Sequence, residues 1–127
     1  MTRYMILIER QIGRIALRLQ MIRMGIDACV TLSGGERHHL GAVAVAQIWE
    51  SLTGKDKLSA TISNITLPGH KEDELARKAA ARLSAALAAN VVVCCGIHLD
   101  NIALAEINEI EIMVMDMMDE LIAAINT

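Results

Sequence analysis

The segment IALRLQMIRMGIDACVTL, residues 15–32, decides the class of fold. In its first half, Ile, Leu and Met at every second position alternate with Ala16, Arg18 and Gln20, and the second half alternates in the same way after Asp27. An alternation with a period of two is typical of a β-strand that buries one face. Gly25 separates the two halves, so the segment is predicted to form an antiparallel hairpin.

Four other apolar runs indicate further strands. YMILIER (4–10) is predicted to be a strand, although a run this short also fits a helix. GAVAVAQIW (41–49) predicts a strand with small alanines on one face, which a bulky group can approach closely. SATIS (59–63) predicts a strand with a face of hydroxyl groups. VVVCCGI (91–97) is apolar throughout, as in strands that are buried on both faces.

Two longer segments predict helices. Residues 71–90 follow Pro68 and Gly69 and have apolar side chains at helical spacing. The acidic residues of KEDE are interpreted as a favourable helix start rather than as paired catalytic carboxylates. A last helix is predicted to start near Asp100 or Asn101, either of which can cap it. Its apolar stripe, which includes Met117, is wide enough to contact both the sheet and a second subunit.

Together these segments predict an α+β fold: a single domain over residues 1–127, with a mostly antiparallel sheet and two main helices packed on it. Hydrophobic residues make up 54% of the chain and aromatic residues only 2%. The core is therefore built from aliphatic side chains, alanine and methionine. Because monomers rarely expose large apolar patches, this composition predicts a homodimer.

Charge and composition argue against several classes of protein. A net charge of −3 and a pI near 5.8 disfavour nucleic acid as the main partner. Charged residues interrupt every apolar run, so no membrane span is predicted. The N-terminal residues do not resemble a secretory signal, and a cytoplasmic location is expected. Cys29, Cys94 and Cys95 lie in apolar surroundings and are interpreted as reduced core residues.

The histidines are the candidate metal ligands. A site would have to combine His38 or His39 with His70 and His98, from three separate junctions between elements. Because none of these residues has the local spacing of a zinc motif, no metal is predicted. No serine or cysteine has an evident activating base, so no catalytic residue is predicted either.

Two features favour a ligand that carries a phosphate. Gly34 and Gly35 form a glycine pair whose backbone N–H groups could face an anion. His70 and Lys71 add donors at a predicted helix start, where negative charge is favoured.

Three motifs, in this order, give the chain a family resemblance. They are GGERHHLGAVAVA (34–46), SATISNITLPGHKEDELARKAA (59–80) and VVVCCGIHLDNI (91–102). Over residues 14–110 the chain resembles the small D subunits of gallate-type, UbiD-like decarboxylases, which are prenylated-flavin chaperones related in fold to proteasome-assembly-chaperone-like proteins. The spacing from GHKEDELA to GIHLDN is the most specific part of the likeness.

This resemblance implies a non-catalytic helper that binds or protects prenylated FMN, or FMN, and assists maturation of a UbiD-like decarboxylase partner. Carried over motif by motif, the implied cofactor-binding residues are Gly34, Gly35, His39, Gly41, His70, Lys71, His98, Asp100 and Asn101. Two alternatives stay open. The chain could be a chaperone that contacts the decarboxylase through protein surfaces alone, or a small metal-assisted enzyme that uses His39, His70 and His98.

The residues themselves suggest how a flavin would be held. His39, His70 and His98 are predicted to line one shared pocket, while His38 points away because neighbours on an extended segment face opposite sides. The flavin ring is predicted to lie on the alanine face of residues 42–46, with Trp49 as the one aromatic side chain placed for stacking.

Overall fold

The residues that the structure describes fold into a six-stranded sheet and two helices. The computed structural model describes residues 4–50, 58–67 and 72–125. The elements, in chain order, are β1 (Met5–Ile12), β2 (Ile15–Met24), β3 (Asp27–Gly35), β4 (Arg37–Glu50), β5 (Leu58–Thr66), α1 (Asp73–Leu87), β6 (Val91–His98) and α2 (Leu104–Ile125). In the sheet the strands are ordered β1-β2-β3-β6-β4-β5, and only β3 and β6 run parallel. The predicted α+β class is confirmed.

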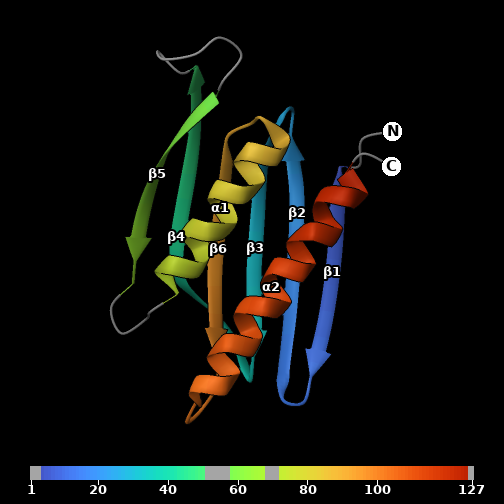
Figure 1. Ribbon diagram of the computed structural model, residues 1–127, viewed down its shortest axis with the longest axis vertical. Helices are drawn as coiled ribbons and strands as arrows, with labels where there is room; N and C mark the ends of the chain where they lie inside the picture. The colour runs from blue at the N-terminus through green and yellow to red at the C-terminus, as the bar shows by residue number, and fades with distance from the viewer. Residues whose placement is uncertain (1–3, 51–57, 68–71, 126–127) are drawn as a thin grey trace.

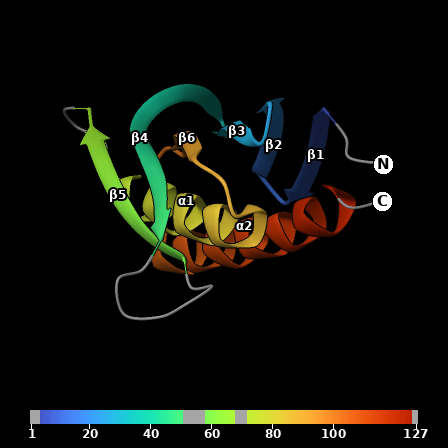
Figure 2. The same cartoon turned by 90° about the horizontal axis from the view of Figure 1, so that it is seen from above.

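Both helices cover the same face of the sheet (Figures 1 and 2). The first helix, α1, packs on β4, β5 and β6, whereas α2 crosses β1 and β2 and touches α1. Of the elements described, none covers the opposite face. One side of the sheet therefore carries the hydrophobic core, and the other side is open.

The predicted hairpin forms β2 and β3. Leu19 pairs with Leu32 and Met21 with Val30, and all four side chains are buried under the helices. Gly25 has a φ of 63°, a left-handed conformation that glycine adopts at little cost and that this tight turn requires. The prediction from alternation is therefore confirmed.

The alanine face of β4 lies under α1. Ala42, Ala44 and Ala46 are fully buried, and α1 brings Ala76 and Ala79 into the same core. Small side chains on both elements let the helix approach the strand closely. The bulky group that these alanines accommodate is thus the chain's own helix, and the prediction that a flavin ring lies on this face is wrong.

The last helix begins later than predicted. Asp100 and Asn101 lie in a turn, and Asn101 has a φ of 51°, which a right-handed helix cannot include. The helix starts at Leu104, where the Glu106 carboxylate accepts a hydrogen bond from the Ala103 N–H at 3.1 Å. Neither Asp100 nor Asn101 therefore caps the helix, which starts a few residues after both.

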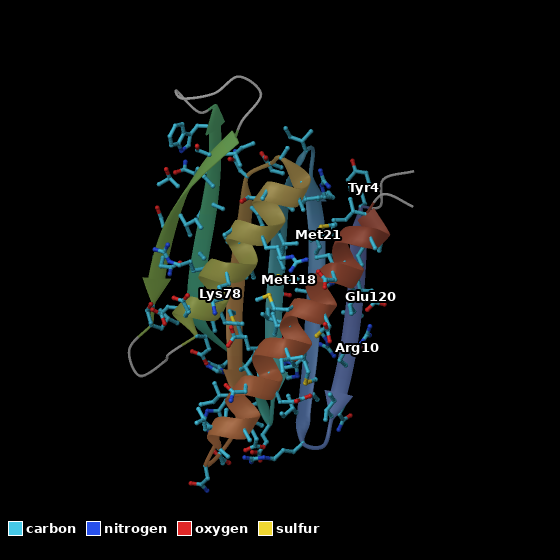
Figure 3. All side chains as sticks on the ribbon, in the orientation of Figure 1. Tyr4, Arg10, Met21, Lys78, Met118 and Glu120 are labelled. Carbon is cyan, nitrogen blue, oxygen red and sulfur yellow. The ribbon has the colours of Figure 1, made fainter. Side chains whose placement is uncertain are left out.

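Most of the apolar stripe of α2 is buried within the chain, although Leu104, Ile107 and Ile112 are exposed. Met117 is fully buried, so its predicted place in a contact between subunits is wrong. Figure 3 shows Met118 on α2 and Met21 on β2, which lies beneath that helix, and both side chains are fully buried. An ion pair between Arg10 on β1 and Glu120 fixes the end of α2 at the sheet edge (Figure 3).

The strand β6 is buried fully on one face only. Val91, Val93 and Cys95 face the helices and are buried, and burial raises the pKa of the Cys95 thiol to about 12. Val92 and Cys94 are half-buried on the open face. The prediction of a strand buried on both faces therefore holds for the helix side alone.

Candidate site at the carboxyl end of β6

Two predicted site histidines meet at one end of the sheet. His39, near the start of β4, places its Nε2 3.0 Å from Oε1 of Glu72, the residue that directly precedes α1. The two side chains are only 20% and 13% exposed. The rings of His39 and His98 lie edge to face, with centroids 6.2 Å apart. Residues 39, 72 and 98, far apart in the sequence, thus form one cluster.

His98 has two polar neighbours that compete for the same ring nitrogen. Its Nε2 lies 2.8 Å from Oδ1 of Asp100 and 2.8 Å from Nη2 of Arg37. A protonated Nε2 donates to Asp100, whereas an unprotonated Nε2 accepts from Arg37. The hydrogen bond from His98 lowers the pKa of the Asp100 carboxyl. Which of these two hydrogen bonds forms depends on the tautomer of the His98 ring.

His38 faces away from this cluster. Its Nδ1 lies 2.8 Å from Oγ of Ser33, and its side chain borders a surface hollow together with Glu9 and Arg18. The other predicted ligands, His70 and Lys71, lie outside the described residues. The structure therefore brings His39 and His98 together, while the contribution of His70 to a shared pocket stays a prediction.

The predicted glycines Gly34, Gly35 and Gly41, and Gly96 in the third motif, have structural roles of their own. A Cβ at Gly41 would overlap the Glu72 carboxylate, and one at Gly96 would overlap the carbonyl of His39, so both glycines make room for the histidine cluster. Gly34 and Gly35 lie within β3, where a Cβ would overlap the carbonyls of neighbouring strands. The two glycines therefore allow close packing between strands. They form the end of a strand and not the predicted anion-binding turn.

An ion network that sequence patterns did not reveal braces the same end of the sheet. Arg14 bonds both carboxylate oxygens of Glu106 at 2.8 Å and Oε1 of Glu36 at 2.6 Å. Glu36 in turn accepts the backbone N–H of Asp100 at 3.0 Å. The Arg14 guanidinium lowers the pKa of the Glu106 carboxyl to about 2. Because these residues come from four separate segments, no local motif could have found them.

A cavity of about 400 Å³ opens beside the cluster, between α1, α2 and the end of β6. Its apolar lining consists of Leu75, Ile97, Ile102, Ile107 and Ile110. Charged residues surround this lining, namely Glu72, Glu74, Lys78 and Glu111. Lys78, on α1 (Figure 3), lies 2.6 Å from Glu111, which raises the pKa of its ammonium group. Its positive charge is thus already paired.

The cavity's chemistry can be compared with the two parts of a flavin nucleotide. Its volume lies within the range of small-molecule sites, and its isoleucine lining suits an uncharged ring system. The phosphate does not suit the rim, where three carboxylates face one paired lysine. Trp49 lies at the opposite end of β4, where its Nε1 donates to Thr61, so its predicted stacking role is wrong for this cavity.

Among the described residues, no three His, Cys, Asp or Glu side chains lie close enough together to hold a metal ion. Nor is any described helix long and apolar enough to cross a membrane.

Comparison with known proteins gives the family. The model of the LpdD-like prenylated flavin chaperone domain matches residues 11–126. The chain belongs to this family. The fold resembles a solved structure of a chaperone complex for yeast 20S proteasome assembly, with a TM-score of 0.53 and 16% identity over 93% of this chain and 98% of that one. A search of curated proteins found no match.

The family confirms the resemblance seen in the three motifs and the interpretation of the chain as a helper rather than an enzyme. The likeness to the proteasome assembly chaperone confirms the predicted relation in fold. The cluster around His39 and the adjacent cavity are therefore parts of an LpdD-like prenylated flavin chaperone domain.

Proposed function

We propose that this LpdD-like domain binds prenylated FMN in the cavity between α1 and α2 and delivers it to a UbiD-like decarboxylase. The observation that carries the proposal is the apolar cavity of about 400 Å³ beside His39 and Glu72, in a chain of a prenylated flavin chaperone family. The bound cofactor would supply the decarboxylation chemistry only in the partner enzyme. The chaperone acts in the cytoplasm, as a homodimer.

The lining of the cavity supports one orientation of the flavin. The ring system, with its added prenyl-derived ring, enters among Ile97, Ile107 and Ile110, because these side chains offer apolar contacts and no charge. The phosphate stays outside, because Glu74 and Glu111 at the rim would repel it.

Several predicted residues would then act around the phosphate or hold the site in shape. His70 and Lys71 immediately precede Glu72 in the sequence and are proposed to meet the phosphate. His39 and His98 do not line the cavity themselves; His39 contacts Glu72, which does, and would hold that carboxylate in place. Asp100, in the turn with Asn101, bonds His98. Gly35, Gly41 and Gly96 leave room for His98, Glu72 and His39, and Gly34 lets β3 pack closely on β2.

Flavin titration of a matched pair of variants tests the proposal. Ile107 lines the cavity and is 46% exposed, whereas Ile112, on the same helix, is 57% exposed and does not line it. Ile107→Glu should weaken the binding of prenylated FMN at least tenfold, measured by the change in flavin absorbance, and Ile112→Glu should leave it unchanged. Riboflavin should bind more weakly than FMN, because it lacks the phosphate that His70 and Lys71 are proposed to meet.

Two results would overturn the proposal that the domain binds prenylated FMN. No flavin binding by the unaltered protein, together with a stable complex with the decarboxylase, would favour a chaperone that acts through protein contacts alone. Retention of one zinc ion per chain that is lost in His98→Ala would favour the metal-assisted enzyme.

A further inference from the structure

The face of the sheet opposite the helices exposes large apolar side chains on β1, β2 and β5. We call it the open face. Its exposed apolar side chains include Met5 (61%), Leu7 (53%), Ile22 (44%) and Ile65 (63%). A surface this rich in large apolar side chains is unusual for a monomer.

Strand register joins these side chains into continuous rows. One row, in sheet order, consists of Met5, Ile22, Cys29, Val92, Val45 and Ser63. The next consists of Leu7, Gln20, Thr31, Cys94, Val43 and Ile65. Neither row contains a charged residue. The open face thus has an uncharged centre that runs from one edge of the sheet to the other.

Charged residues lie beside these rows. Glu9 and Arg18 flank the row of Leu7 and pair with each other at 3.5 Å, and Asp27 lies beyond the row of Met5. A largely apolar, uncharged centre within a charged rim is the usual arrangement of a protein–protein interface.

We infer that the open face is the surface through which a second copy of this chain binds, sheet against sheet. This inference names the contact surface of the homodimer in the proposed function, and it does not depend on flavin binding.

The size of the open face matches what a stable dimer needs. Six strands about 4.8 Å apart, each contributing about seven residues at about 3.3 Å, give a plane of roughly 650 Å². Side chains make the accessible area larger than this plane, so the face approaches the about 800 Å² that each partner contributes to a standard interface.

Symmetry makes a second copy the suitable occupant. In a two-fold dimer the same surface patch contacts itself, so any charge near its centre would meet a like charge or lose water without a partner. Because the two central rows are uncharged, the open face can pack against its own copy without that cost.

Sedimentation velocity over a range of protein concentrations tests the inference, with Ile22→Glu against Ile112→Glu. Ile22 lies in a central row and is 44% exposed in the single chain, so a glutamate there should be tolerated by the monomer, as thermal melting would verify. We expect the unaltered protein to be a dimer at about 10 µM and Ile22→Glu to weaken association at least 100-fold. Ile112→Glu, on the helix side, should remain dimeric.

Thiol alkylation gives a second, independent readout. Cys29 and Cys94 are half-buried on the open face, whereas Cys95 is buried in the core. In the dimer all three should react slowly, and in Ile22→Glu only Cys29 and Cys94 should react faster. A monomeric unaltered protein would overturn the inference, as would a dimer disrupted by Ile112→Glu and not by Ile22→Glu. If the protein alone is monomeric and Ile22→Glu abolishes its complex with the decarboxylase, the open face binds that partner instead.

Discussion

The contact between His39 and Glu72 makes a quantitative prediction, because it links β4 to the start of α1. The two side chains approach to 3.0 Å and are 20% and 13% exposed, so water screens them only weakly. A hydrogen bond that involves a charged group contributes about 1.5–3 kcal/mol. Allowing for the remaining exposure, we expect a coupling free energy of about 1–2 kcal/mol between these two side chains.

A double-mutant cycle measures that coupling. His39→Ala, Glu72→Ala and the double variant would be unfolded in urea and followed by circular dichroism, and the free energies of unfolding compared. The cycle is needed because each side chain has other neighbours, whose loss contributes to the single variants but cancels in the coupling. Each single variant should also lower Tm by several degrees.

Glu74 supplies the matched control. It lies two residues after Glu72 and lines the same cavity, and its carboxylate is on the exposed surface of α1. Glu74→Ala combined with His39→Ala should be additive within about 0.5 kcal/mol. Equal coupling for both carboxylates, or coupling of less than about 0.5 kcal/mol for Glu72, would show that this contact does not fasten α1 to β4.

Three further predictions concern stability. Because the folded pKa of Glu106 is lowered from 4.5 to about 2, its contribution is present above pH 4.5 and is lost as the pH falls toward 2; Glu106→Gln should therefore reduce the drop in Tm over this range. Gly96→Ala should destabilise the fold by about 1–3 kcal/mol in urea unfolding, because its Cβ would overlap the His39 carbonyl. Leu83→Ala should lower the free energy of unfolding by about 2–5 kcal/mol in the same assay, since Leu83 is fully buried between α1 and the sheet. A smaller loss would mean that α1 shifts to fill the space that the missing side chain leaves.

Local patterns predicted the strands and the first helix well, because each such signal lies within one segment. The hairpin of β2 and β3 followed from alternation around Gly25, and α1 from apolar spacing after Pro68. The place of β6 between β3 and β4 did not follow, since strand order depends on contacts between distant parts of the chain. The same holds for the placement of both helices on one face.

The wrong predictions share a physical cause, which is that one residue type can occur in several kinds of local structure. Asp100 and Asn101 are suitable helix caps, but asparagine also tolerates the left-handed turn that Asn101 adopts. The alanines of β4 predicted a close approach without identifying the helix that makes it. The methionine-rich stripe of α2 predicted a contact between subunits, whereas Met117 packs in the chain's own core.

The candidate site was predictable only in its motif residues. His39 and His98 could be singled out because they stand near glycines in the motifs that suggested the family resemblance. The Glu72 contact, the Arg14 network and the isoleucine cavity depend on tertiary packing, and ordinary aliphatic residues such as Ile107 carry no signal of a binding site.

The open face and the cavity lie on opposite sides of one sheet, and this separation has a consequence for the proposed delivery of a flavin. Both helices lie on one side of the sheet (Figure 2), and the cavity is formed between them. Ile22 and its row are on the other side, because Ile22 alternates along β2 with Leu19 and Met21, which are buried on the helix side. Two chains that associate sheet against sheet would keep both pairs of helices outward. Each cavity would then stay accessible to a decarboxylase without dissociation of the dimer, so Ile22→Glu should abolish dimerisation while leaving the flavin affinity of each chain unchanged.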